Sequence, residues 1–471
     1  MAERKQNICT LCSLGCGLVI ETDAGAPVAL DYCKDCRVNE GALCAKGNYA
    51  LELLNHPMRL TEPIKDGRAL GWDETAAEIA APLSSPTAAL IVEGDMSDEE
   101  AGMLTSFASA CLAPARVAVS FATNDDDVVS ALAEIPAPPA SIEDLENSAC
   151  TIAVNDPFSV GPVVARWVMR ARNAARDNTL NVIAPSEGLV SKFATIKLIG
   201  PVRAGLLCLL KNLIELAGDS APDWAKATKG DLSRIAPGEN DTDAARLARV
   251  FAEAGSGVIL LSTSDPVAAR LAACCSLVAG DTKKVFLLND YGNASGICEN
   301  IQGGAGVENI LGGVADGSVD TLVVLGTDLV SSYPGVGVES DLKKLKFFAA
   351  GAPFPNKTTA LAHIVLPTAI WLEKDGTFNA AARSAVAEPA GGARSYGDIL
   401  EMLARAMNVP MAPAGGISRG ALELNAEFVA NLVSEAATPA AEPVVASTAT
   451  RFADGSVTDN LSWPQALKAE A

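Results

Sequence analysis

The feature that most constrains this chain is a cluster of cysteines near its start. Three stand in one tight run, Cys9-x2-Cys12-x3-Cys16, and a fourth, Cys44, follows after 27 intervening residues. Three closely spaced thiolates can hold three corners of an iron–sulfur cubane, and a distant fourth thiolate can close it. Zinc sites more often pair two short cysteine knuckles. The spacing therefore predicts a [4Fe–4S] cluster on these four residues, with a structural zinc site as the alternative.

The other eight cysteines divide into a pair and a scattered set. Cys33 and Cys36 form a further Cys-x2-Cys, which we interpret as a bystander or a local thiol pair. A redox pair, or a zinc half-site shared with Cys9 and Cys12, are the alternatives. The remaining six occur in apolar strings, and free cysteine is among the most buried residue types. We expect these six to be core residues: Cys111, Cys150, Cys208, Cys274, Cys275 and Cys298.

Charge and composition exclude several classes of function. Acidic residues outnumber basic ones by 57 to 36, giving a formal charge of −21. A field of that sign repels phosphate backbones and anionic lipids, so we expect no nucleic-acid partner and no docking to membranes through basic residues. We find no apolar run of the roughly 18 residues that a membrane-spanning helix needs. With no recognisable secretory signal, we expect a cytoplasmic protein without a membrane span.

The pattern of apolar residues predicts an α/β fold. Short β-branched runs such as AALIVEG, CTIAVND, GVILLST and TLVVLGT alternate with Ala/Leu-rich helical stretches such as GPVVARWVMRARNAA. Continuous apolar strands separated by helices are typical of parallel sheets covered on both faces. We therefore expect two doubly wound parallel-sheet domains behind a small cysteine-rich N-terminal domain.

The cysteine region resembles a known family. The strings CTLCSLGCG, VNEGALCAKGNYALELLNHPMRLTEPI and GWDETAAEIA are similar to the Fe–S domain of the molybdopterin oxidoreductase superfamily. That superfamily includes catalytic chains of formate dehydrogenases and formylmethanofuran dehydrogenases, and the large Fe–S subunit of respiratory complex I. A weaker likeness continues through SIEDLENSACTIAVNDPF, VDTLVVLGTDL and AHIVLPTAIWLEKDGTF. The resemblance implies a truncated DMSO reductase-like fold.

The resemblance also implies where the domains begin and end. We expect one α/β domain to be inserted into the other, and residues beyond 410 to be an extended tail or docking arm, because they are rich in Ala, Pro and Ser. The expected parts are a [4Fe–4S] domain over 1–62, the first part of an α/β domain over 63–136, the inserted α/β domain over 137–335, the second part of the first over 336–410, and a C-terminal tail over 411–471.

Further site residues follow from the family alone. By resemblance, Lys46 lies between the cluster and a pterin and is a candidate electron relay. If a pterin is bound, the resemblance implies that it contacts Lys46, Asn155, Lys374, Asp375 and Gly376. The cofactor would then be molybdopterin guanine dinucleotide with molybdenum or tungsten.

Two departures from the family pattern affect the expected function. The stretch RVAVSFATNDDDVVSALAEI, where catalytic members carry a Cys, selenocysteine or Ser metal ligand, has no cysteine. Only 61 residues follow residue 410, too few for the fourth domain that clamps the pterins in complete catalytic subunits. We predict an active-site scaffold that has lost its catalytic Cys and its fourth domain.

Two functions remain after these departures. The first is an iron–sulfur electron-transfer subunit of a multisubunit cytoplasmic oxidoreductase complex, with other Fe–S or flavin subunits as partners and no confidently assigned catalytic residue. The alternative is the catalytic Mo/W-bis-pterin subunit of a formate or formylmethanofuran dehydrogenase-like enzyme whose fourth domain lies on another chain.

Overall fold

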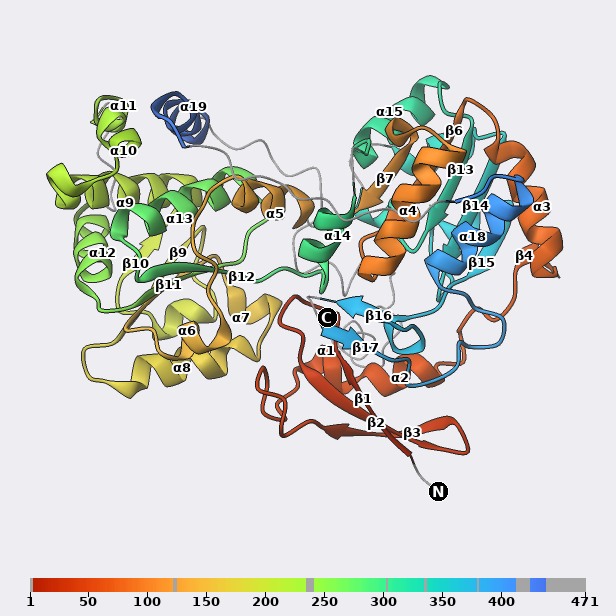
Figure 1. Cartoon of the computed structure of the whole chain (residues 1–471), viewed down its shortest axis with the longest axis horizontal. Helices are drawn as coiled ribbons and strands as arrows, with labels where there is room; N and C mark the ends of the chain where they lie inside the picture. The colour runs from red at the N-terminus through yellow and green to blue at the C-terminus, as the bar shows by residue number, and fades with distance from the viewer. Residues whose placement is uncertain are drawn as a thin grey trace. The chain divides into compact units, whose positions relative to one another are not determined.

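The computed structural model describes residues 3–121, 125–233, 241–301, 304–333, 337–378, 381–411 and 424–437. The chain divides into two compact units, each drawn in Figure 1. Of the described residues, the first unit contains 3–121, 291–301, 304–333, 337–378 and 381–411, and the second contains 125–233, 241–290 and 424–437. The second unit is thus inserted into the first.

The first unit begins with a small antiparallel sheet in the order β1-β2-β3. Leu18 and Ile20 of β2 are fully buried, as is Leu53 of α2, which packs against β3. This sheet carries the cysteine run in the connection between its first two strands. Its elements are β1 (Glu3–Ile8), β2 (Gly17–Asp23), β3 (Ala26–Tyr32), α1 (Ala45–Asn48) and α2 (Ala50–Asn55).

The main sheet of the first unit has seven strands in the order β5-β4-β15-β14-β13-β6-β7. Every residue of β6 and β13 is buried, as expected for central strands of a parallel sheet. When the five parallel strands are numbered in chain order, they lie side by side in the doubly wound order 2-1-3-4-5. The point where this order reverses, the switch point of the sheet, lies between β6 and β13. The strands are β4 (Ile64–Lys65), β5 (Arg68–Ala69), β6 (Ala88–Glu93), β7 (Val117–Ser120), β13 (Thr321–Leu325), β14 (Phe347–Ala352) and β15 (Ile364–Pro367).

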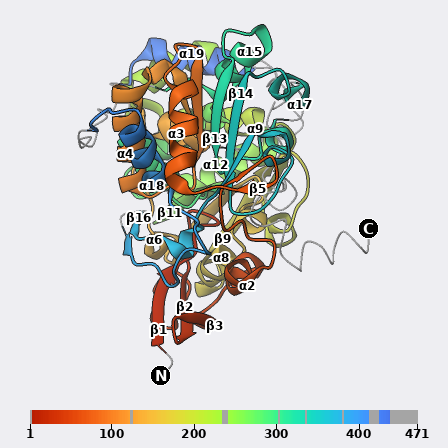
Figure 2. The same cartoon turned by 90° about the vertical axis from the view of Figure 1, so that its right-hand side faces the viewer.

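Helices cover both faces of this sheet (Figure 2). Helix α18 packs against α3 and α4 on one face, while α15 and α17 close an apolar cluster with β6, β13 and β14 on the other. A short hairpin, β16 with β17, follows β15 and contacts α4 and β1. The elements are α3 (Trp72–Leu83), α4 (Asp98–Cys111), α14 (Ala294–Asn300), α15 (Val307–Asp316), α16 (Leu329–Ser332), α17 (Val338–Leu342), α18 (Tyr396–Ala406), β16 (Gly376–Phe378) and β17 (Ala381–Arg383).

The second unit is built on a five-stranded parallel sheet in the order β10-β9-β8-β11-β12. This is the doubly wound order 3-2-1-4-5, with its reversal between β8 and β11. Strands β8 and β11 are buried along their whole length, which explains why both appear in the sequence as unbroken apolar runs. The strands are β8 (Cys150–Val154), β9 (Thr179–Ala184), β10 (Lys197–Ile199), β11 (Gly257–Leu261) and β12 (Lys283–Leu287).

Two groups of helices enclose this second sheet (Figure 1). Helices α5, α9, α12, α13 and α19 share one large apolar core with the strands, while α6 and α8 pack together against β8, β9 and β11. The helices are α5 (Asp125–Ala133), α6 (Ile142–Glu146), α7 (Pro157–Val160), α8 (Val164–Ala174), α9 (Val202–Ala217), α10 (Asp223–Ala227), α11 (Lys229–Ser233), α12 (Asp241–Glu253), α13 (Pro266–Ala279) and α19 (Ala426–Ala437).

The structure places the domain boundaries differently from the sequence-based ones. Residues 291–335, expected in the inserted domain, include β13, which is hydrogen-bonded between β6 and β14 and so belongs to the first unit. Residues 125–133, expected in the first unit, form α5, which packs against α13 of the second. An apolar strand carries no mark in its sequence of which sheet it joins, so only the pairing decides.

The expectation of an extended tail is also wrong in part. Residues 426–437 form α19, whose Val429, Leu432 and Val433 are buried in the core of the second unit. Residues 412–423 and 438–471 lie outside the described part of the chain. Among the described residues, no helix is both long and apolar enough to cross a membrane.

Candidate iron–sulfur site

The cysteine run forms the tight connection between β1 and β2. The Cys9 N–H donates to the Cys16 carbonyl at 2.8 Å, which closes the base of this loop. Gly15 has φ +68, a left-handed conformation that a residue with a side chain adopts only at a cost. Cys9, Cys12 and Cys16 are all buried and all have free thiols. The loop therefore holds three adjacent sulfur ligands out of water.

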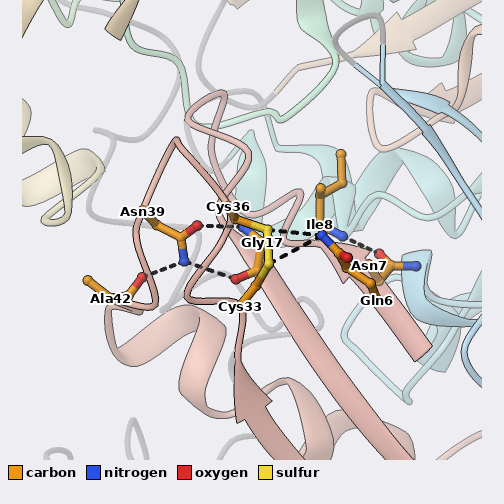
Figure 3. The surroundings of a disulfide bond; sticks show 8 residues. All are labelled: Gln6, Asn7, Ile8, Gly17, Cys33, Cys36, Asn39 and Ala42. Atoms are coloured by element: carbon orange, nitrogen blue, oxygen red, sulfur yellow. Dashed lines mark hydrogen bonds between the residues drawn. A yellow bond between two sulfur atoms is a disulfide. The ribbon is translucent and has the colours of Figure 1, made fainter. Parts of the chain in front are cut away.

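A buried asparagine connects the fourth cysteine's segment to this loop. The Asn39 side chain accepts from the Gly17 N–H at 2.9 Å and donates to the carbonyls of Gly17 and Ala42 at 2.9 and 2.8 Å. It thereby joins the residue after Cys16 to a residue two positions before Cys44 (Figure 3). Cys44 is the N-cap residue of α1 and has a free, partly exposed thiol.

The four thiols are close enough to influence one another's ionisation. Burial, followed by the charges of Cys12 and Cys44, raises the pKa of Cys9 to about 12. Burial and the other three cysteines also raise the pKa of Cys16 well above its usual range. Four thiolates here would repel one another in a medium of low polarity, so their ionised forms require bound cations.

In the described residues, no group of three or more His, Cys, Asp or Glu side chains is arranged to hold a metal ion. The expectation of a [4Fe–4S] cluster therefore rests on the spacing of the four cysteines in the sequence and on their mutual effect on ionisation.

Lys46 lies beside the cysteine loop. Its side chain is buried, and Nζ donates to the Leu11 carbonyl at 3.1 Å within the loop itself. The positive charge lowers the pKa of Cys9, opposing the effects of burial and of the neighbouring thiols. Lys46 therefore both braces the loop and offsets negative charge on its sulfurs.

A second buried cation, Arg383, was not found by the sequence analysis. It ends β17, is 7% exposed, and none of its three guanidinium nitrogens has a hydrogen-bond partner among the described atoms. Burial lowers its pKa to about 10, although the charges of Asp95, Glu100 and Cys9 oppose that shift. The guanidinium carbon of Arg383 lies over the Phe378 ring, 3.2 Å from its centroid, and a negatively charged cluster on the nearby cysteines would further offset its charge. The only signal in the sequence is a lone arginine within FNAAARSA.

Three of the residues expected to contact a pterin lie between β15 and β16 or at the start of β16, and each contacts other residues of the protein. They are Lys374, Asp375 and Gly376. Lys374 Nζ lies 3.0 Å from Glu100 Oε2 and donates to the Asp95 carbonyl at 3.1 Å. Asp375 accepts a hydrogen bond from the Ala385 N–H at 2.8 Å. Gly376 has φ +149, and a Cβ there would approach the Ser97 side chain to 2.5 Å. These residues stabilise the junction of the hairpin with α4.

Internal side chains also fill the crevice at the switch point of the first unit, between the ends of β6 and β13. In doubly wound sheets, ligands bind at this place. A Cβ on Gly326, just after β13, would lie 2.2 Å from the Tyr396 hydroxyl and 2.6 Å from Glu93 Cβ. Tyr396 is 3% exposed, and its ring lies against the Lys374 ammonium.

Asn155 occupies the corresponding place in the second unit, at the end of β8. Its φ is +61, and its side-chain amide donates to the Ser262 carbonyl at 2.5 Å, just after β11. The next residue, Asp156, accepts from the Leu189 N–H at 2.7 Å. Both polar side chains at this switch point therefore have internal partners.

The stretch RVAVSFATNDDDVVSALAEI, where the family resemblance implies a metal ligand, includes β7 and α5. Ser120, the hydroxyl nearest to the expected ligand position, is fully buried at the end of β7 and lies 3.2 Å from the Tyr333 hydroxyl. Residues 122–124 of that stretch lie outside the described part of the chain. Ser120 is thus a buried strand residue whose hydroxyl has an internal partner.

The structure joins Cys33 and Cys36 in a disulfide, so the two residues are bonded to each other and are not free thiols. Gln6 Nε2 of β1 donates to both sulfurs, at 3.2 and 3.0 Å (Figure 3). A Cβ on Gly17 would lie 2.1 Å from Cys36 Sγ, so the disulfide packs directly on the backbone that follows Cys16.

Comparison with known proteins agrees with this site. Residues 2–56 match the family described as the molybdopterin oxidoreductase Fe4S4 domain. This match agrees with the resemblance seen in the cysteine strings and supports a 4Fe–4S cluster.

The likeness to characterised proteins extends beyond that domain. The chain is 27% identical to F420-dependent formate dehydrogenase 2 subunit alpha of Methanococcus maripaludis, over 79% of this chain and 64% of the relative. It is 24% identical to NADPH-Fe(3+) oxidoreductase subunit alpha of Geobacter sulfurreducens, over 84% and 55% respectively. It is also 24% identical to one subunit of the NADH-quinone oxidoreductase of Pseudomonas fluorescens, over 79% and 43%. The chain thus spans less than two thirds of the length of these relatives.

A solved structure shows the same fold. Acetylene hydratase from Pelobacter acetylenicus superposes with a TM-score of 0.68 at 16% identity, covering 86% of this chain and 69% of that chain. Together with the Fe4S4 domain and the two parallel sheets, this match confirms the expected fold class.

Proposed function

We propose that this chain is an iron–sulfur electron-transfer subunit of a multisubunit oxidoreductase. Cys9, Cys12, Cys16 and Cys44 would hold one [4Fe–4S] cluster, which supplies one-electron redox chemistry when bound. The proposal is supported by the gathered free thiols, by the matching Fe4S4 domain, and by relatives whose names identify them as subunits of oxidoreductases.

One observation favours electron transfer over substrate catalysis. Lys374 is a central residue of the expected pterin contacts, yet its side chain is 2% exposed and is ion-paired with Glu100, which is 6% exposed. A buried pair of this kind breaks only at a large energetic cost. Lys374 is therefore better suited to holding α4 against the β16–β17 hairpin than to binding a cofactor.

The residues around the thiols suit a site that changes charge by one electron. Lys46 and Arg383 place positive charge near Cys9, which favours the more negative, reduced state of a bound cluster. Burial of the three-cysteine loop limits access of water to the sulfurs, and the hydrogen bond from the Gly292 N–H to the Thr10 carbonyl at 3.0 Å closes one side of it. Exclusion of water and nearby charge are two of the factors that set a cluster's potential.

A catalytic role is the second candidate, and one observation favours it. The buried guanidinium of Arg383, whose nitrogens have no hydrogen-bond partner among the described atoms, could equally neutralise an anionic pterin cofactor beside the cluster. The chain would then be the Mo/W-bis-pterin subunit of a formate or formylmethanofuran dehydrogenase-like enzyme, with its fourth domain on another chain. Relatives named as formate dehydrogenase subunits are consistent with this candidate.

Metal and nucleotide analysis of the anaerobically purified complex distinguishes the two candidates. Electron transfer alone predicts about four Fe per chain, without stoichiometric Mo, W or releasable guanine nucleotide. Stoichiometric Mo or W with guanine nucleotide would refute it in favour of catalysis, and zinc in place of iron would refute both. As a matched pair of variants, Cys44→Ser should remove the iron and the reduced-state EPR signal, whereas Cys111→Ser in α4 should keep both.

We further propose a cytoplasmic location and partner subunits that carry Fe–S clusters or flavin. A single one-electron centre needs a donor and an acceptor close by, and the relatives' names show that such chains occur as subunits. The small N-terminal sheet offers exposed apolar side chains for such contacts at Val28 and Tyr32, which are 54% and 44% exposed. Val28→Asp should weaken assembly without lowering the iron content, and an unchanged yield of complex would contradict this placement.

A further inference from the structure

We propose that Cys33 and Cys36 form a second redox site, a dithiol/disulfide pair that exchanges two electrons with an external dithiol. The pair lies in the same small domain as the four expected cluster ligands but is not one of them. All ten other cysteines are free thiols, so this is the one disulfide in the part of the chain that the structure describes. The proposal is independent of whether the chain transfers electrons or acts on a substrate.

The position of the pair allows attack from solvent on one sulfur. Cys36 is partly exposed, whereas Cys33 is 6% exposed. Thiol–disulfide exchange requires that an incoming thiolate reach one sulfur while the other departs. The exposed Gln6 amide, which donates to both sulfurs, can stabilise the negative charge that forms on the departing one. Cys36 is therefore the sulfur attacked and Cys33 the first to leave.

The exchange balances as a two-electron reduction. A thiolate of the external dithiol forms a bond to Cys36 Sγ, the Cys33–Cys36 bond breaks, and Cys33 leaves as a thiolate that takes up a proton. The second thiol of the reductant then displaces Cys36, which also takes up a proton. The pair gains two electrons and two protons, and the external dithiol becomes a disulfide.

Contacts of the pair link its redox state to the cluster loop. Cys36 Sγ packs on Gly17, where there is no room even for a Cβ. The Cys36 carbonyl accepts from the N–H groups of Asn39 and Glu40 at 3.2 and 2.7 Å, which positions Asn39 to clamp Gly17 and Ala42 (Figure 3). Reduction separates the two sulfurs to van der Waals contact. Because Gly17 blocks Cys36 Sγ on one side, we expect the turn at Cys36 or the backbone after Cys16 to shift on reduction.

The first test measures whether the pair is redox-active in the folded protein. The full chain with its reconstituted cluster is incubated anaerobically with dithiothreitol, alkylated with iodoacetamide, and analysed by peptide mass spectrometry. We expect labelling of Cys33 and Cys36 to rise at least tenfold on reduction, while Cys274 and Cys275, both fully buried, stay unlabelled. A pair that resists excess dithiothreitol, or that is labelled equally without it, would overturn the proposal.

The second test measures the link to the cluster. Release of iron to a ferrous chelator should become several-fold faster after dithiothreitol treatment of the native chain. The double variant Cys33→Ser/Cys36→Ser should release iron at the faster rate with or without dithiothreitol, and Cys111→Ser should behave like the native chain. If dithiothreitol accelerates iron release equally in the double variant, the redox state of Cys33 and Cys36 does not affect the cluster loop, and the proposed link between the pair and the cluster is refuted.

Discussion

Replacing Lys374 by methionine is the sharpest test of whether this residue holds the fold together or binds a cofactor. Its ammonium and the Glu100 carboxylate are 3.0 Å apart, and the two side chains are 2% and 6% exposed. Removing one member of such a buried pair leaves the other charge uncompensated, at a typical cost of about 3–5 kcal/mol. Glu100 keeps the N–H groups of Ser97 and Tyr396 as donors, which places the expected loss near the lower end, about 3 kcal/mol.

Such a loss is large enough to measure by thermal unfolding of the cluster-loaded chain. At roughly 2–4 °C per kcal/mol, Lys374→Met should lower the midpoint of the first unit by about 6–12 °C. The double variant Lys374→Met/Glu100→Gln should recover part of this, because it removes both charges. Lys343→Met, which breaks the exposed pair with Glu339, should leave the midpoint unchanged. If Lys374→Met behaves like Lys343→Met but lowers the content of Mo, W or guanine nucleotide, the residue binds a cofactor and our reasoning fails.

Three further perturbations have defined outcomes. Arg383→Gln should lower the cluster's reduction potential in an EPR-monitored titration by an amount on the order of tens of millivolts, because removing a positive charge that acts on Cys9 disfavours the more negative, reduced state. An unchanged potential would place this charge elsewhere. Burial raises the pKa of Cys150 from 9.0 to about 11. The Cys150 thiol therefore contributes its full share to the free energy of unfolding below about pH 9, and this share falls by ~3 kcal/mol as the pH rises through 11. Cys150→Ala should make the free energy of unfolding, measured by denaturant titration, differ less between about pH 8 and pH 11. Leu432→Ala in α19 should destabilise the second unit by about 2–5 kcal/mol, while the cluster's visible absorption persists. If the visible absorption is lost in the same transition as the second unit's structure, the two units do not unfold separately.

Local patterns carried most of what could be predicted from the sequence. The run of Cys9, Cys12 and Cys16 specifies one loop, because its ligands are neighbours in the chain. Buried strands such as TLVVL are apparent because central strands of parallel sheets are apolar along their whole length. The small domain and the two doubly wound sheets follow from these two signals.

Contacts between distant parts of the chain could not be predicted in the same way. Glu100 and Lys374 are 274 positions apart, and Glu100 and the Tyr396 N–H that it accepts are 296 apart. Nothing near any of these residues indicates its partner, so Lys374 could be assigned only through the family resemblance. The same limit explains the misplaced boundary at β13, whose sheet is decided by pairing with β6 and β14.

The missed helix α19 has a different cause, because its signal was present. Val429, Leu432, Val433 and Ala436 recur at the spacing of one helix face, and all four are buried. The Ala- and Pro-rich composition of the stretch that follows, EAATPAAEPVVASTAT, outweighed this short amphipathic segment in our interpretation. Composition averaged over a long window conceals a helix of three turns, whereas periodicity within it does not.

The buried polar side chains at the sheet crevices and at the cysteine loop differ in whether they have hydrogen-bond partners. At the switch points of both sheets, Lys374 and Asn155 have internal partners. Beside the cysteine loop, Arg383 is buried with no hydrogen-bond partner among the described atoms. The carboxylates of Asp95 and Glu100 and the ring of Phe378 offset part of that charge, and the thiols nearby ionise more readily when cations bind them. An iron–sulfur cluster with thiolate ligands would supply iron cations to the thiolates and further negative charge beside the guanidinium. This is why we regard the cysteine loop, rather than the two sheet crevices, as the functional centre of the chain.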